Sequence, residues 1–213
     1  MLNFLNIANI ISLLMAAAAA LISITVHEYC HGFAAYKLGD DTAKIYGRLS
    51  LNPFKHIDWF GAFCLVVFKF GWAKPVPINT YNLKKPRRDI PIISLAGPVS
   101  NFLLAFVSLF IFYLVPVKEG FFLYLRSFLM QMVFLNLGLG LFNLIPIPPL
   151  DGSKVLASFL PAGTAYKYLS FGRYGTLLLV LLLLFGALTP YLNLAVAAIG
   201  RFFEIIIQFL LGI

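Results

Sequence analysis

Long apolar runs separated by short polar stretches dominate this chain. A helix that crosses a bilayer needs roughly 20 predominantly apolar residues. The stretches of about that length extend from Phe4 to about Leu38, from Ile90 to about Pro116, from Phe121 to about Pro146, from about Phe171 to Thr189 and from about Leu192 to Leu211. Only Thr189-Pro190-Tyr191 separates the last two, which predicts a tight turn and a helical hairpin. The pattern predicts an α-helical integral membrane protein with about five transmembrane helices.

The region at 39–89, between the first two predicted spans, follows a different pattern. Thr42 to Leu51 alternates loosely, and Trp72 to Asn79 has the prolines of an extended segment. Gly61 to Phe70 is apolar but too short to cross a membrane, so it forms either a re-entrant hairpin or a buried strand. Open backbone at membrane depth must be covered by protein or line a water-filled cavity. We therefore expect a membrane-associated β or re-entrant region here.

Composition supports the membrane class and charge suggests an orientation. The chain is 61% hydrophobic and 11% charged, with a mean hydropathy of +0.92, which makes the lipid bilayer its expected surroundings. A net charge of +8 could indicate nucleic-acid binding in a soluble protein, but ten of the sixteen Lys and Arg residues lie at 37–88, beside apolar spans. We expect no nucleic-acid partner. The positive-inside rule instead predicts a multi-pass protein of the cell membrane, with its N-terminus outside, the 39–89 loop in the cytoplasm and its C-terminus inside.

The chain is expected to form a single domain over residues 1–213. Its predicted parts are a first helix at 1–38, the cytoplasmic-side region at 39–89, the second and third spans with the segment after them at 90–160, and a C-terminal hairpin at 171–211. The apolar start has no basic residues of the kind that begin a signal peptide, so we expect it to be retained. Cys30 and Cys64 do not constitute a disulfide framework.

The first predicted span contains the sequence His27-Glu28-Tyr29-Cys30-His31. Histidines at i and i+4 lie on one face of a helix, about one turn apart, so both imidazoles can bind one Zn²⁺ while Glu28 reaches a metal-bound water. The alternative is a helix end with polar residues facing water. Mostly apolar residues precede His27, however, and an apolar stretch follows His31. Ionisable groups inside a span are costly and usually functional, so the sequence predicts one zinc ion per chain within the membrane.

A catalytic zinc normally has three protein ligands and one open position. Most of the remaining acids have another expected role: Glu119 lies on the opposite side of the membrane, Asp40, Asp41 and Asp89 look solvated, and Glu204 is spaced to pair with Arg201. The candidates left for the third ligand are His56, Asp58 and Asp151.

Asp151 is the favoured candidate. It follows three prolines that break the third span and hold an extended stretch near the cytoplasmic side, and it begins a new short helix. The alternative is that its carboxylate only caps that helix, which would contribute about 1 kcal/mol.

Two amides also lie in apolar surroundings. His27 is roughly 15 Å inside the cytoplasmic end of its helix, at 1.5 Å per residue. Asn101 lies at a similar depth in the second span, and Asn143 lies near the end of the third. Buried amides need partners. Interhelical hydrogen bonds and an oxyanion or substrate contact are equally compatible with the sequence.

The chain resembles the site-2 proteases, a family of intramembrane zinc metalloproteases. The matching stretches are His27 to Gly32 (HEYCHG), Gly47 to Pro53 (GRLSLNP), His56 to Asp58 (HID), Gly71 to Asn79 (GWAKPVPIN), Leu95 to Asn101 (LAGPVSN) and Phe142 to Gly152. They occur in the family's order and cover most of the chain. Two departures from the usual pattern are Trp59, where proline is common, and Cys30, where small apolar residues are common.

The resemblance implies that His27, His31 and Asp151 bind the zinc and that Glu28 is the general base. His56 and Asp58 would support the site or take part in gating. It also implies single-span membrane proteins as substrates, cut within or near their transmembrane segment by Glu28-activated water, and a minimal form of the family without PDZ or CBS domains. The site would open toward the cytoplasm, and a substrate could pair as a strand with the 39–89 region.

Three other functions remain open on sequence grounds. A prenyl-protein protease would share only the zinc pair. A non-catalytic metal-binding scaffold or a transporter would have no need of Glu28 beside His27, although transporters also use broken helices and buried carboxylates. The sequence does not predict an oligomeric state.

Overall fold

The computed structural model describes residues 7–61 and 73–213. In these ranges the helices are α1 (Ile7–Lys37), α2 (Thr42–Ile45), η2 (Pro53–Lys55), η3 (Thr80–Asn82), α4 (Pro86–Leu114), α5 (Phe121–Asn143), α6 (Asp151–Phe159), α7 (Ala162–Ser170), α8 (Gly172–Leu184) and α9 (Thr189–Leu211), with η marking 3₁₀ helices. Cys64 and nearly all of the predicted hairpin or strand at Gly61–Phe70 lie outside the described residues.

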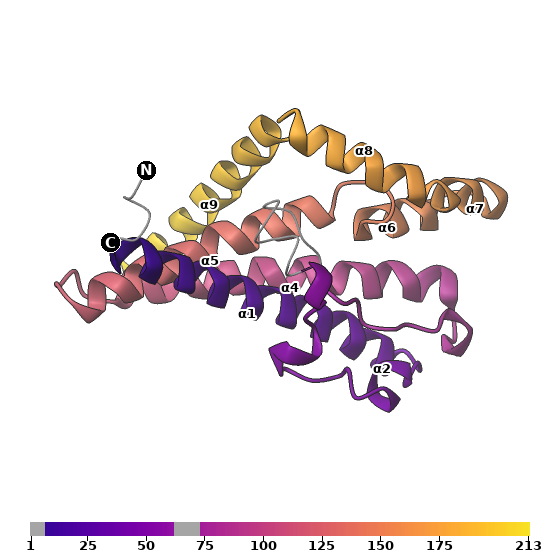
Figure 1. The fold of residues 1–213 in the computed structure, drawn as a ribbon, viewed down its shortest axis with the longest axis horizontal. Helices are drawn as coiled ribbons and strands as arrows, with labels where there is room; N and C mark the ends of the chain where they lie inside the picture. Colours follow the sequence, from indigo (N-terminus) through magenta and orange to yellow (C-terminus); the bar gives the residue numbers. More distant parts are fainter. Residues whose placement is uncertain (1–6, 62–72) are drawn as a thin grey trace.

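The long helices α1, α4 and α5 run side by side as a bundle (Figure 1). The core between α4, α5 and α9 consists of apolar side chains, which are Ala105, Leu109, Val133, Leu137 and Ile207. Small residues let the helices approach closely. At Gly140, for example, an added Cβ would lie only 3.0 Å from the Phe102 ring. The bundle thus brings the faces of three apolar helices together, as the hydrophobic pattern predicts.

The helices long and apolar enough to cross a membrane are α1, α4, α5 and α9, and α7 with α8 forms a further candidate bent by 54°. This confirms the predicted class of an α-helical, multi-pass membrane protein. The boundaries of the last two predicted spans were wrong. α8 ends at Leu184, Gly186 turns the chain with φ of 67°, and α9 already begins at Thr189. Pro190 does not interrupt α9, because a proline in the first helical turn loses no hydrogen bond.

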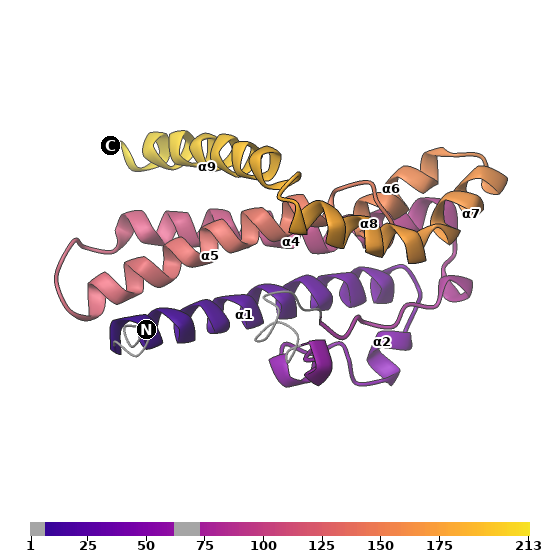
Figure 2. The ribbon, with the colours of Figure 1, turned by 45° about the horizontal axis from the view of Figure 1, so that its top comes forward.

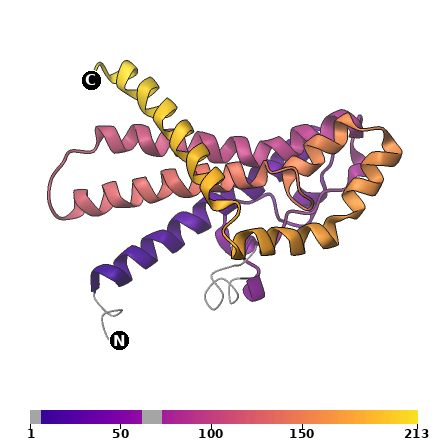
Figure 3. The ribbon, with the colours of Figure 1, turned by 90° about the horizontal axis from the view of Figure 1, so that it is seen from above.

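α8 and α9 together lead from the end of the bundle that holds α6 and α7 back to the opposite end (Figures 1 and 2). The start of α1 and the end of α9 therefore lie at the same end of the molecule, which is also visible from above (Figure 3). The described residues hold four candidate spans, or five with the bent α7–α8 pair, in agreement with the predicted number of about five.

The described part of region 39–89 is mostly irregular. Residues 42–51, predicted to alternate, contain the short helix α2, and residues 73–79 are extended as expected. The only β pairing in the described ranges is an isolated antiparallel bridge between Ile57 and Ala73. Pro75 and Pro77 have no N–H to donate to a ladder, which limits strand pairing at this segment.

Asp40 ties this region together, although the sequence suggested that it was solvated. Its carboxylate is buried and accepts hydrogen bonds from the backbone N–H of Thr42 at 3.1 Å and of Asn79 at 2.7 Å, and from Asn82 Nδ2 at 2.9 Å. The Thr42 hydroxyl also donates to it. Burial alone would raise the pKa of Asp40, but these hydrogen bonds outweigh burial and hold the pKa below its ordinary value.

Two other acids were also assigned wrongly from the sequence. Asp89 is fully buried at the start of α4, where it accepts from the Lys85 N–H at 2.9 Å and pairs with Arg88 at 2.8 Å. An acid in the first turn of a helix also interacts favourably with the helix dipole. Arg201 and Glu204, expected to form an ion pair, are not within pairing distance of each other in the described structure.

Candidate metal centre

Helix α1 places His27 and His31 one turn apart on its buried face. Both side chains are almost completely shielded, with 5% and 7% of their surface exposed. Their Nε2 atoms lie 2.9 Å apart. The spacing read from the sequence thus produces two imidazole nitrogens directed at one point inside the bundle.

Asp151 reaches the same point from the first residue of α6. Its Oδ2 lies 3.1 Å from His31 Nε2 and 3.3 Å from His27 Nε2, while its Oδ1 accepts from Lys154 Nζ at 3.0 Å. The N-cap position belongs to Leu150, and no side chain caps this helix. Asp151 therefore faces the histidines instead of the end of its own helix.

Gly152 explains how α6 can begin so close to the broken end of α5. A Cβ at this position would overlap the carbonyl oxygen of Leu144 and lie 2.9 Å from that of Ile145. Because both neighbours are backbone atoms, they cannot move aside cheaply. The glycine lets the chain fold back tightly and brings Asp151 to the histidines.

The outer nitrogen of each histidine is held by an acceptor. His31 Nδ1 lies 2.7 Å from the carbonyl oxygen of Ile93 on α4, and His27 Nδ1 lies 2.6 Å from Asn101 Oδ1. A backbone carbonyl can only accept, so Nδ1 of His31 carries a proton, and the neutral imidazole then has its free lone pair on Nε2.

A chain of buried amides assigns the same tautomer to His27. Asn136 Nδ2 donates to the Met132 carbonyl at 2.8 Å and to Ser23 Oγ at 2.8 Å, which leaves Asn136 Oδ1 to accept from Asn101 Nδ2 at 2.8 Å. Asn101 Oδ1 must then face His27, so His27 Nδ1 is the donor. The Met132 carbonyl on α5 therefore sets the orientation of the His27 ring through Asn136 and Asn101.

These three residues fit a zinc ion. Two unprotonated Nε2 atoms and a carboxylate oxygen lie 2.9–3.3 Å from one another, with all three side chains buried. Lone pairs held this close repel each other unless a cation lies between them. Zinc bonds of about 2.0–2.2 Å in a tetrahedron place ligand atoms about 3.3–3.6 Å apart, so small adjustments accommodate the ion. Three protein ligands leave a fourth position for water or substrate.

Helix α4 packs directly against the two imidazoles at Gly97. A Cβ there would overlap His31 Nε2 and would lie 2.6 Å from the Cε1 atoms of both His27 and His31. Any larger residue would displace the rings. The glycine of the sequence stretch at 95–101 is thus explained by the closeness of α4 to the candidate metal ligands.

Glu28 faces a different neighbour from the histidines beside it. Its side chain is partly exposed, and its Oε2 accepts from the backbone N–H of Val76 at 2.8 Å. Val76 lies in the extended segment at 73–79. The candidate base is therefore held by the 39–89 region, and the candidate ligands are held by the helix bundle.

The other sequence candidates lie in other surroundings. Asn143 Nδ2 donates to the Leu139 carbonyl one turn earlier at 2.9 Å. His56 Nε2 contacts the Ser50 carbonyl at 2.7 Å, and Asp58 accepts from two backbone N–H groups in the turn that follows it. Among the described residues, the group of potential metal ligands contains His27, His31 and Asp151 only. Cys30 does not belong to it.

Sequence reasoning missed Ser23, Asn136 and Val76. Asn136 had a signal, because it is an amide inside an apolar stretch like Asn101. Ser23 and Val76 had none, because their roles arise from contacts between segments 48 or more positions apart.

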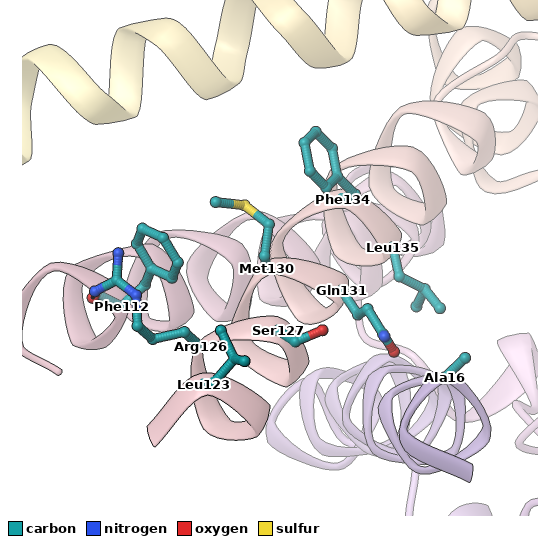
Figure 4. A pocket seen from close by; sticks show the side chains of 9 residues that line it. All are labelled: Ala16, Phe112, Leu123, Arg126, Ser127, Met130, Gln131, Phe134 and Leu135. Carbon is teal, nitrogen blue, oxygen red and sulfur yellow. The ribbon is translucent and has the colours of Figure 1, made fainter. Parts of the chain in front are cut away.

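A separate groove lies along residues 123–135 of α5, beside Phe112 of α4 and Ala16 of α1 (Figure 4). Its volume is about 690 Å³, and no candidate metal ligand lines it. Arg126, its charged member, already donates to the carbonyls of Phe112 at 2.9 Å and Val115 at 2.7 Å. Arg126 thereby closes the C-terminal end of α4, and the groove takes no part in the site.

Comparison with known proteins identifies the family. Residues 15–122 and 117–186 match the model of "Peptidase family M50". A Bacillus subtilis protein named "Putative zinc metalloprotease YwhC" is 42% identical over 200 residues, covering 90% of this chain and 91% of that protein. "Putative zinc metalloprotease Rip2" of Mycolicibacterium smegmatis is 30% identical over 204 residues, covering 92% and 73%. No solved structure matches the chain. The chain belongs to peptidase family M50, the site-2 protease family of membrane metalloproteases.

Proposed function

We propose that this chain is an intramembrane zinc endopeptidase, in which His27, His31 and Asp151 bind one Zn²⁺ and Glu28 is the general base. The observation that carries the proposal is the convergence of two Nε2 lone pairs and one carboxylate at a buried point. Both histidines have their other nitrogen committed to an acceptor, as in metal sites of known proteins. Membership of a metalloprotease family supports the same reaction.

Held by His27, His31 and Asp151, a zinc ion would supply a water molecule of lowered pKa and would polarise the carbonyl of the peptide to be cut. Glu28 takes the proton from the attacking water and later delivers it to the leaving amine. The bond between Glu28 Oε2 and Val76 leaves Oε1 available for this transfer. Asn101 has its amide atoms committed to His27, Asn136 and Ser23, which favours a role in orienting His27 over a contact with substrate. Asn143 remains a candidate for a substrate contact.

The proposed substrates are single-span membrane proteins. A helix hides its peptide bonds, so a substrate must unwind before a bond can reach Glu28. The backbone at 73–79 lies beside Glu28. Because Pro75 and Pro77 cannot donate, an unwound substrate stretch would pair with this segment mainly by donating its own N–H groups to the segment's carbonyls. By the charge distribution, this region faces the cytoplasm, and water enters from that side.

The test is a paired measurement of zinc content and cleavage on purified protein in detergent, with a tagged single-span substrate. Glu28→Gln should bind zinc like the wild type and lose cleavage, because the amide cannot accept the proton. Glu204→Gln, which changes an acid outside the site, is the matched control and should retain both. Cleavage by Glu28→Gln would remove Glu28 from the base role. Zinc binding without any cleavage by the wild type would favour a scaffold or transporter.

A further inference from the structure

We infer that the backbone amide of Val76 is the positioning group for Glu28, and that the extended segment at 73–79 exists to present this amide. The inference rests on the proposed role of Glu28 as base. The Val76 N–H donates to Glu28 Oε2 at 2.8 Å, across 48 positions of sequence. A glutamate has three side-chain torsions, so a carboxylate without a fixed partner would sample many positions. One held oxygen fixes where the other can meet a water.

The residues on both sides of Val76 have no backbone N–H group. Pro75 and Pro77 flank it, and proline has neither a backbone N–H nor a freely variable φ. The residue before a proline is also restricted to extended conformations, which applies to both Lys74 and Val76. The triplet is therefore stiff, and Val76 is its single backbone donor.

The segment is anchored on both sides of Val76. Before it, Arg48 Nη2 donates to the carbonyls of Lys74 at 2.6 Å and Pro75 at 3.3 Å. After it, the Asn79 N–H donates to Asp40 Oδ2 at 2.7 Å. Arg48 and Asp40 are both buried, so the anchors are shielded from water.

The side chain of Val76 is fixed against α1 as well. It is buried with 6% of its surface exposed, and it packs against Gly32, one turn beyond Glu28. A Cβ at Gly32 would lie only 3.1 Å from Val76 Cγ1. Gly32 thus leaves the space that the Val76 side chain occupies. This contact fixes the position of the Val76 amide along the axis of α1.

The activity test compares Val76→Pro, which removes the N–H, with Val76→Ala, which keeps it. Val76→Pro should lower kcat on the order of 100-fold with KM and zinc content unchanged, because the base is misplaced while the metal ligands are not. Val76→Ala keeps the N–H and loses only the packing against Gly32, so its kcat should fall clearly less than that of Val76→Pro. Equal losses in the two variants would show that side-chain packing matters instead of the amide, and unchanged kcat in Val76→Pro would overturn the inference.

A second measurement does not depend on activity or on bound metal. In the peptide spanning 74–79 the amides of Lys74, Val76 and Asn79 are hydrogen-bonded, and hydrogen exchange should show only the Val76 amide exchanging faster in Glu28→Ala, with no change in Glu204→Ala. No difference between Glu28→Ala and the wild type would contradict the inference even if the chain is a protease. The expected difference in a chain that cuts nothing would leave the contact established and would refute the proposed function instead.

Discussion

The two halves of the site are held in different ways. The candidate metal half consists of His27 and His31, whose partners on α4 and α5 are the Asn101–Asn136 pair and the Ile93 carbonyl, and of Asp151, which pairs with Lys154 on α6. The base half consists of Glu28 and a backbone amide from an irregular segment. In the proposed enzyme, the bundle would therefore hold the zinc ligands and the 39–89 region would hold the base. Changes in the first half should therefore alter zinc affinity, and changes in the second should alter rate.

The largest expected effect is on the metal half. Asp151→Ala removes one of the three proposed ligands, and zinc affinity should fall by more than about 100-fold. Zinc content of the purified protein after dialysis against a weak chelator measures this. Asp41→Asn, at an exposed position outside the site, is the control and should keep its zinc. Full zinc occupancy in Asp151→Ala would exclude Asp151 as a ligand.

Gly97→Ala tests whether the bundle itself shapes the metal half. The added methyl would overlap the imidazoles, so zinc affinity should fall and the free energy of unfolding should drop by about 1–3 kcal/mol. Gly138 lies on α5 with open space around it, so Gly138→Ala is the matched control and should be neutral or slightly stabilising. Thermal unfolding without added zinc measures the change in stability, and the further stabilisation on adding zinc measures the change in zinc affinity. Equal behaviour of the two variants would mean that α4 does not press on the ligands.

Asn101→Ala tests the hydrogen-bond chain behind His27. Loss of the partner of a metal-binding histidine typically lowers metal affinity by about 10- to 100-fold. The effect should appear in the zinc dissociation constant, and cleavage at saturating zinc should recover substantially. In the described structure the Asn143 amide donates to the Leu139 carbonyl of its own helix. Asn143→Ala should therefore leave zinc affinity unchanged. A loss of cleavage that zinc does not restore would instead favour a substrate contact for Asn101.

The smallest expected effect is a pH dependence of stability that arises from Asp40, which anchors the segment at 73–79. The pKa of Asp40 is lowered in the folded protein, so its contribution to stability is complete above the unfolded pKa of about 3.9 and is lost as pH falls through the folded value. The difference in melting temperature between wild type and Asp40→Asn should shrink as pH falls from 7 toward 3. A constant difference over this range would show that the charge of Asp40 does not hold the segment at 73–79.

The sequence was sufficient for the parts of the molecule that depend on local spacing. Helical periodicity predicted that His27 and His31 lie together, and the prolines before Asp151 predicted that its carboxylate lies near them, as it does. The role of Glu28 as base stays a prediction. The helix break at Gly186 could not be predicted, because the surrounding leucine-rich run is uniformly apolar and Pro190 was the stronger local signal. The burial of Asp40 and the contact between Val76 and Glu28 depend on how distant segments meet, which no local pattern encodes.

The central claim is that the two histidines and Asp151 bind zinc without a sulfur ligand. X-ray absorption at the zinc edge of the purified wild-type protein tests it most directly. We expect only nitrogen and oxygen atoms bound to the zinc, at about 2.0–2.2 Å, with the scattering signature of two imidazoles. A sulfur contribution near 2.3 Å would point to Cys30 and contradict the proposed ligand set.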